Sequence, residues 1–296
     1  MSRIRRSRSA SANPFRKCIF LEGATYDHYS VVRCGSNIYT KPCASVAANL
    51  SVFSLTDIDA AESGATIPRK ALLSVSESIP EYGATFHSYD QIGTNKTHTK
   101  LFVYKYPNYN IYEIDPETGV STVAFTWSAD LVPTDYRMEQ FIFDETTRTM
   151  LVGTIAPNGT NSFINFKKFN VGTTYPYGRT SSTGDFYFTT YPYEGSPRYI
   201  LKAGGTPDFQ NDRLWYYRGV NSTSKKLSIS YADSPMSVNT QVKNLTWPTH
   251  PDMGSGLGMW VSDNYIYMGG YQNKGFCAYD FTYNMHMFGR DANFVY

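Results

Sequence analysis

The feature that most constrains the fold of this chain is a short hairpin pattern that recurs along it. Residues 110–114 alternate apolar and polar side chains, Asp115-Pro116-Glu117-Thr118-Gly119 follows as a turn, and residues 120–125 alternate again. An Asp before Pro, with Gly closing the turn, reverses the chain sterically and predicts an antiparallel hairpin. The same order of strand, polar turn and strand returns over residues 140–154 and 265–288. A chain that repeats this unit is expected to form antiparallel sheets of short strands.

The composition points the same way. Aromatic residues make up 16% of the 296 residues and charged residues only 18%, and aromatic side chains suit the half-buried surface of a strand. The 22 Gly and 15 Pro interrupt the chain at short intervals, and no long stretch keeps a helical period. Residues 55–80 have the weakest strand signal, so a short helix and an irregular excursion both stay open there. We expect one all-β domain.

The hairpin Tyr112-Glu113-Ile114-Asp115-Pro116-Glu117-Thr118-Gly119 resembles the Tyr-x-Ile-Asp-Pro-x-Thr-Gly hairpin of β-propeller families. The resemblance is to a pattern that covers about residues 85–290 and not to one family, because the marks of WD40 repeats are absent. It implies an all-β fold, a β-propeller, with blades of about 40–50 residues and therefore about five or six blades. The alternative is a jelly roll or another β-sandwich, whose strands alternate in the same way.

The first 17 residues differ from the rest of the chain. They hold no acidic residue and six basic ones, which are Arg3, Arg5, Arg6, Arg8, Arg16 and Lys17. Such a segment cannot build a core, so we divide the chain into a basic N-terminal arm, residues 1–17, and a propeller domain, residues 18–296. Arginine forks pair with carboxylates of a neighbouring subunit or with phosphates of nucleic acid, and the arm is expected to contact one of these.

Loops in which Tyr adjoins Pro form a second candidate surface. Tyrosine presents a rigid amphipathic ring at low entropic cost, which suits the binding of glycan or protein. The ordinary alternative is that these rings anchor turns over a sheet edge. The predicted loop surface consists of Tyr106, Tyr109, Tyr175, Tyr177, Tyr191 and Tyr193.

No pattern in the chain predicts catalysis or a bound metal. Glycoside hydrolysis needs two carboxylates beside the scissile bond, but every candidate aspartate is better explained as a turn residue. Those candidates are Asp90, Asp130, Asp135, Asp185, Asp212, Asp233 and Asp263. The cysteines Cys18, Cys34, Cys43 and Cys277 form no C-x-x-C pair, so neither a structural zinc site nor any other cofactor is expected. We therefore expect a protein that is not an enzyme.

An all-β, tyrosine-rich chain with a net charge of +2 and a basic arm resembles virion proteins, above all the propeller-bearing nozzle or hub proteins of bacteriophage tails. That resemblance implies a structural component of a virus particle, located in the virion. Its expected partners are other virion proteins and copies of itself in a ring, with glycan and nucleic acid as further candidates. The alternatives are a glycan-binding receptor protein or propeller glycosidase, and a jelly-roll capsid protein. No signal peptide and no apolar run long enough to span a membrane are predicted.

Overall fold

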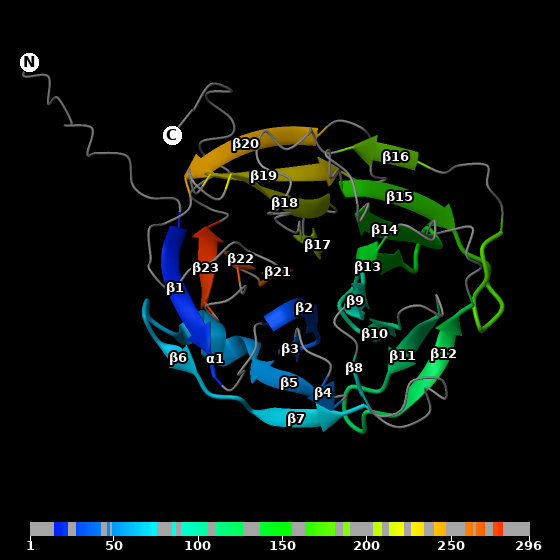
Figure 1. Cartoon of the computed structure of the whole chain (residues 1–296), viewed down its shortest axis with the longest axis horizontal. Coiled ribbons are helices and arrows are strands. Elements are labelled where there is room, and N and C mark those ends of the chain that lie inside the picture. Colours follow the sequence, from blue (N-terminus) through cyan, green and yellow to red (C-terminus); the bar gives the residue numbers. More distant parts are fainter. Residues whose placement is uncertain are drawn as a thin grey trace, which may run out of the picture.

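The computed structural model is a ring of antiparallel sheets around a central axis (Figure 1). The structure describes the following residues: 15–22, 28–42, 46–47, 49–75, 85–86, 90–105, 110–126, 137–155, 164–180, 186–189, 204–208, 213–221, 226–233, 240–246, 258–262, 265–269 and 275–280. Within these ranges the chain forms strands and one short helix, so the prediction of an all-β fold is confirmed.

The first three blades follow one another along the chain, and the strands of each are arranged in chain order from the inside of the ring outward. Blade 1 contains β2 (His28–Cys34), β3 (Asn37–Pro42), β5 (Asn49–Ser54) and β7 (Ala71–Ser74). Blade 2 contains β9 (Gln91–Asn95), β10 (Leu101–Tyr104), β11 (Ile111–Ile114) and β12 (Ser121–Phe125). Blade 3 contains β13 (Arg137–Asp144), β14 (Thr149–Ile155), β15 (Ile164–Asn170) and β16 (Phe186–Thr189). A short parallel pairing of β9 with β13 joins blades 2 and 3 in one sheet.

The last two blades complete the ring. Blade 4 contains β17 (Gly204–Asp208), β18 (Arg213–Asn221), β19 (Lys226–Asp233) and β20 (Thr240–Thr246). Blade 5 contains β21 (Gly258–Val261), β22 (Tyr265–Gly269) and β23 (Gly275–Asp280), followed by β1 (Phe15–Leu21) and β6 (Thr66–Ile67). β4 (Val46–Ala47) and β8 (Thr85–Phe86) pair with each other in a separate two-stranded sheet. The described strands thus form a five-bladed propeller, which confirms the predicted fold class and not the sandwich.

The ring is closed by strands from both ends of the chain. β1 pairs antiparallel with β23, with Cys18 opposite Cys277, and β6 then adds to β1 in parallel. β1 begins at Phe15, so the last three residues of the predicted arm, 15–17, contribute backbone to the closing strand.

Hydrophobic side chains fill the spaces between neighbouring blades. Leu101 and Val103 of β10 face a cluster shared with blade 1, whereas Phe102 and Tyr104 face a cluster shared with blade 3. Successive side chains of a strand point to opposite faces, so a blade packed on both faces is buried at every position, as β10 is. A third cluster joins blades 5 and 1 and includes Trp260.

Candidate functional site: the outer rim

Lys17 links the closing strand β1 to the helix α1 (Leu55–Ala60). Its Nζ donates hydrogen bonds to the carbonyl oxygens of Ile58 at 2.9 Å, Asp59 at 2.8 Å and Ala61 at 2.8 Å. The ammonium also lies 5.2 Å from the ring centroid of Tyr265. Lys17, which the sequence placed in the partner-contacting arm, is therefore buried and bonded within the chain itself.

The local sequence explains why this contact forms. Ser54 caps the start of α1, since its Oγ accepts a hydrogen bond from the Asp57 amide at 3.2 Å, and the carbonyls at the helix end are left without helical partners. Those carbonyls meet the three hydrogens of the Lys17 ammonium. Burial lowers the pKa of Lys17, and the neighbouring Asp59 carboxylate partly opposes that shift. Tyr267 donates to Asp59 Oδ1 at 2.7 Å, and burial raises the pKa of this tyrosine.

The other basic residues of the predicted arm are not positioned by these contacts. Arg16 lies in β1, but its side chain falls outside the described part of the chain. The remaining residues of the prediction lie wholly outside the described ranges: Arg3, Arg5, Arg6 and Arg8. What the structure fixes is the point at which they join the fold, namely Phe15 at the start of β1, near the outside of blade 5.

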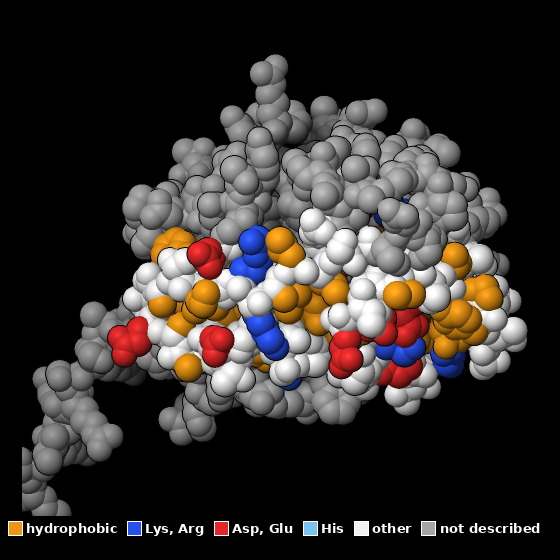
Figure 2. Space-filling view, turned by 90° about the horizontal axis from the view of Figure 1, so that it is seen from below, with side chains coloured by type: hydrophobic (Ala, Val, Ile, Leu, Met, Phe, Trp, Pro, Cys, Tyr) orange, Lys and Arg blue, Asp and Glu red, His pale blue; other side chains and the backbone are white. Residues whose placement is uncertain are grey.

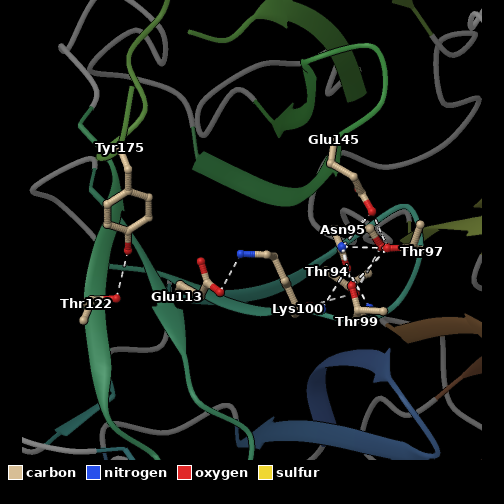
Figure 3. A network of polar contacts seen from close by, with 9 residues as sticks. All are labelled: Thr94, Asn95, Thr97, Thr99, Lys100, Glu113, Thr122, Glu145 and Tyr175. Atoms are coloured by element: carbon tan, nitrogen blue, oxygen red, sulfur yellow. Dashed lines mark hydrogen bonds and ion pairs between the residues drawn. The ribbon is translucent and has the colours of Figure 1, made fainter. Parts of the chain in front are cut away.

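The structure places the tyrosines of one predicted loop in two different roles. Tyr177 packs between blades 2 and 3, with its ring centroid 5.2 Å from Phe125 and 5.7 Å from Phe143. The Arg148 guanidinium lies 4.4 Å from the Tyr177 ring. Tyr175 is 47% exposed, and its hydroxyl is 2.9 Å from Thr122 Oγ1 (Figure 3). Tyr177 is thus a partly buried packing residue, and Tyr175 is the more exposed of the two.

The other tyrosines of the predicted surface lie outside the described residues, namely Tyr106, Tyr109, Tyr191 and Tyr193.

The most exposed large hydrophobic side chains of the described residues follow the outside of blades 1 and 2. They are Leu72 and Val120, each 51% exposed, and Tyr175. The turn that precedes Val120 packs against β7, because a Cβ added to Gly119 would lie only 1.9 Å from the carbonyl oxygen of Ser74. We call the surface formed by β7, the turn from Asp115 to Val120, Thr122 and Tyr175 the outer rim. Figure 2 looks onto this side of the molecule and shows hydrophobic side chains between acidic and basic ones.

Charge on the outer rim is divided between its two ends. Arg69 and Lys70 are exposed just before β7. Asp115 and Glu117 are exposed in the turn packed against the end of β7. Asp115 Oδ1 accepts hydrogen bonds from the amides of Glu117 at 2.8 Å and Thr118 at 3.0 Å. These hydrogen bonds lower the pKa of Asp115, and the bond from the Thr118 amide has the largest effect.

The sequence pattern had identified the turn from Asp115 to Gly119 but not β7. Residues 71–74 carried too weak a strand signal to be assigned.

A polar network joins the inner turns of blades 2 and 3 (Figure 3). The Asn95 amide nitrogen donates to Glu145 Oε1 at 2.9 Å, and Asn95 Oδ1 accepts from the backbone amides of Thr99 and Lys100, each at 2.8 Å. Thr97 also donates to Glu145 Oε1. Asn95 is only 1% exposed, so its amide must be satisfied inside the protein. The network is a junction between blades, and no sequence motif had marked it.

The structure brings none of the described candidate carboxylates or metal ligands together in a site. Asp90 is fully buried and forms an ion pair with Lys105, which is also buried. Asp233 lies in β19 with its side chain outside the described set, and the other predicted aspartates lie wholly outside it. Among the described residues there is no group of three or more His, Cys, Asp or Glu side chains that could hold a metal ion. The part of the chain that the structure describes also contains no helix long and apolar enough to cross a membrane.

Comparison with known proteins gives no family assignment. No family model matches the chain, and no curated protein matches it. Solved structures with some similarity include hydrazine synthase from Kuenenia stuttgartiensis, at 12% identity and a TM-score of 0.38, covering 81% of this chain. This chain spans 60% of that chain.

Two further similar structures are propeller domains. The β-propeller domain of Nup133 from Vanderwaltozyma polyspora matches at 10% identity and a TM-score of 0.41, over 85% of this chain and 70% of that one. The β-propeller domain of Cps50 (Swd1) from Myceliophteria thermophila matches at 6% identity and a TM-score of 0.42, over 87% of this chain and 97% of that one. The propeller assignment above rests on the sheet order and not on these matches.

Proposed function

We propose that this protein is a structural component of a larger assembly, in which the propeller is a rigid disc that docks on neighbouring subunits. The observation that carries the proposal is the way in which the basic segment joins the fold. Residues 1–14 continue directly into β1, and Lys17 fixes β1 to α1. An arm anchored near the outside of a disc is well placed to reach a neighbour.

The charge distribution supports docking between subunits. Residues 1–14 contain four of the 27 Lys and Arg residues and no acidic residue. The rest of the chain therefore holds 23 basic and 25 acidic residues, a formal net charge of −2. Opposite charge on the arm and the body favours an arm that binds the body of another copy, because complementary charges steer association. The exposed Leu72 and Val120 add apolar surface on the outer rim.

We further propose that the assembly is a virus particle and that the protein serves in a phage tail as a nozzle, hub or adaptor. This step rests on the resemblance of the sequence to such proteins. Its partners are then other tail proteins and copies of this chain arranged as a closed ring. The virion is the corresponding location.

The test compares the full chain with a variant that lacks residues 2–14 and with a variant in which Arg3, Arg5, Arg6 and Arg8 are all serine. Both variants keep β1, which begins at Phe15. Electron microscopy and sedimentation should show rings or larger particles for the full chain and loss of them in both variants. Identical particles from all three chains would contradict a docking role for the arm. Binding of labelled duplex DNA that is lost in both variants would instead support genome contact.

Glycan binding is a second candidate, and one observation favours it. The exposed ring of Tyr175 is held by its hydroxyl contact with Thr122 at 2.9 Å and by edge packing on Tyr177 at 5.2 Å between ring centroids. A fixed, exposed ring is a platform on which a sugar can stack. Binding to a glycan array should fall at least about tenfold in Tyr175→Ser, and unchanged binding would exclude this site. Release of reducing ends from a polysaccharide panel separates a glycosidase from a binding protein.

A further inference from the structure

Two neighbouring outer strands differ in how their free edges are protected. The outer edge of β12 is covered by the segment around Tyr177, whose amide donates to the Ala124 carbonyl at 2.7 Å while its carbonyl accepts from the Thr126 amide at 3.1 Å. β7 has a strand neighbour only on its β5 side among the described residues. An uncovered strand edge is a template for another strand.

The side chains of β7 do not protect its edge. Ala71, Leu72 and Ser74 are exposed and only Leu73 is buried, in the cluster shared with blade 2. Proteins usually blunt an edge strand with a charge, a proline or a bulge within it, and β7 contains neither a charged residue nor a proline. Leu72, at 51% exposure, instead places an apolar side chain at its centre.

The charges that flank β7 indicate which strand it pairs with. Arg69 and Lys70 precede the strand, and the turn that carries Asp115 and Glu117 packs against its other end at Ser74. When two copies of one strand pair antiparallel, the start of each lies beside the end of the other. The basic end of each β7 would then face the acidic turn of the other copy, so the same charge contact would form twice. This surface is complementary to itself.

We infer that β7 is a dimerisation edge, at which a second copy of this chain pairs antiparallel through a two-fold axis. Such an interface uses the same patch on both copies. Residues directly opposite each other in a strand pair place their side chains on the same face of the sheet. The register that puts the exposed side chains of both copies on one face therefore places Leu72 opposite Leu72 of the second copy. Lys70 then lies opposite Ser74, next to the acidic turn.

The register gives a direct test by cross-linking. Opposite residues of an antiparallel pair have Cβ atoms about 4.5–5.5 Å apart, which is close to the separation that a disulfide spans. The variant Leu72→Cys, oxidised mildly in the full chain, should form a dimer whose linked peptides join residue 72 to residue 72. Exposed Thr122→Cys, on the covered edge of β12, is the matched control and should stay uncrosslinked. Equal cross-linking of the two variants would overturn the inference.

Charge reversal tests the pairing in solution without a covalent bond. Sedimentation velocity should show a dimer of the full chain that weakens at least about tenfold in Lys70→Glu and in Glu117→Lys. The double variant restores opposite charges across the axis and should recover the affinity of the original chain. The proposal would be overturned if the full chain were a monomer at all concentrations, or if neither charge reversal changed the affinity of the dimer. Unchanged thermal unfolding of each variant shows that the fold is intact.

The same dimer should persist when residues 2–14 are removed, because β7 and its flanking charges remain. Loss of larger particles with retention of this dimer supports both proposals separately. Loss of the dimer together with the arm would refute the β7 edge and leave the arm as the contact.

Discussion

Replacing Lys17 with methionine tests whether this residue holds the closing strand in place. Methionine keeps the length and apolar stem of the side chain but removes the ammonium. The carbonyls of Ile58, Asp59 and Ala61 then lose their donor. Some of these groups are only partly buried, so water replaces part of what is lost.

The expected cost follows from the contacts that disappear. A hydrogen bond from a charged donor contributes about 1.5–3 kcal/mol net, and a cation at the end of a helix adds about 0.3–1 kcal/mol. Burial disfavours the ammonium, as the lowered pKa of Lys17 indicates, which offsets part of the gain. We therefore expect the free energy of unfolding to fall by about 2–3 kcal/mol.

Urea denaturation followed by circular dichroism measures this loss as a lower midpoint at an unchanged slope. Lys100→Met is the matched control, since the Lys100 side chain is 37% exposed and its ion pair with the partly exposed Glu113, at 2.7 Å, lies at the surface. A surface ion pair contributes little, so the control should change stability by no more than about 1 kcal/mol. Hydrogen exchange should accelerate in β1 before it does in β10. A Lys17→Met protein as stable as the control would refute the role of this contact in closing the ring.

Other perturbations probe the blade junctions and the buried thiol. Gly119→Ala, which combines a φ of +75° with a clash against β7, should lower the thermal midpoint clearly more than Gly35→Ala, whose Cβ would meet nothing within 4 Å; equal losses would contradict the blade contact. Asn95→Asp places a second carboxylate beside Glu145, so the variant should be destabilised at pH 7 by about 3 kcal/mol. Because repulsion raises the pKa of the pair in the folded state, the urea midpoint should recover as the pH falls toward 5, and a pH-independent loss would argue against charge as the cause. Burial, with a smaller contribution from Glu113, raises the pKa of Cys34 to about 11, so iodoacetamide at pH 8 should leave this thiol unmodified until the protein is unfolded, as peptide mass spectrometry would show.

Local sequence patterns were sufficient to predict the hairpins, because a hairpin is specified by residues close in sequence. The turn at Asp115 has the chemistry that such a turn requires, and its carboxylate accepts two backbone amides as that chemistry implies. The apolar run of residues 101–104 is typical of a strand. It did not reveal that both faces are buried, since that depends on blades 1 and 3 lying on either side.

Contacts between segments far apart in the chain could not be predicted from such local patterns. Lys17 looked like one more arm cation, yet its three acceptors lie 41 to 44 residues away. Tyr175 and Tyr177 looked alike, and only packing against Phe125 and Phe143 distinguishes the partly buried ring of Tyr177 from the exposed ring of Tyr175. β7 had no strand signal of its own and is defined by pairing with β5.

The sequence by itself therefore determined that this protein is built from antiparallel hairpins, because turn chemistry and side-chain alternation act over a few residues. The tertiary structure alone decided that β1 from one end of the chain closes the ring against β23 from the other. It also decided that, among the described residues, the outer edge of β12 is covered by the segment around Tyr177, whereas β7 pairs only with β5. These outcomes depend on which segments meet in space, and the free energy that selects them comes from burial and hydrogen bonding between residues far apart in the chain.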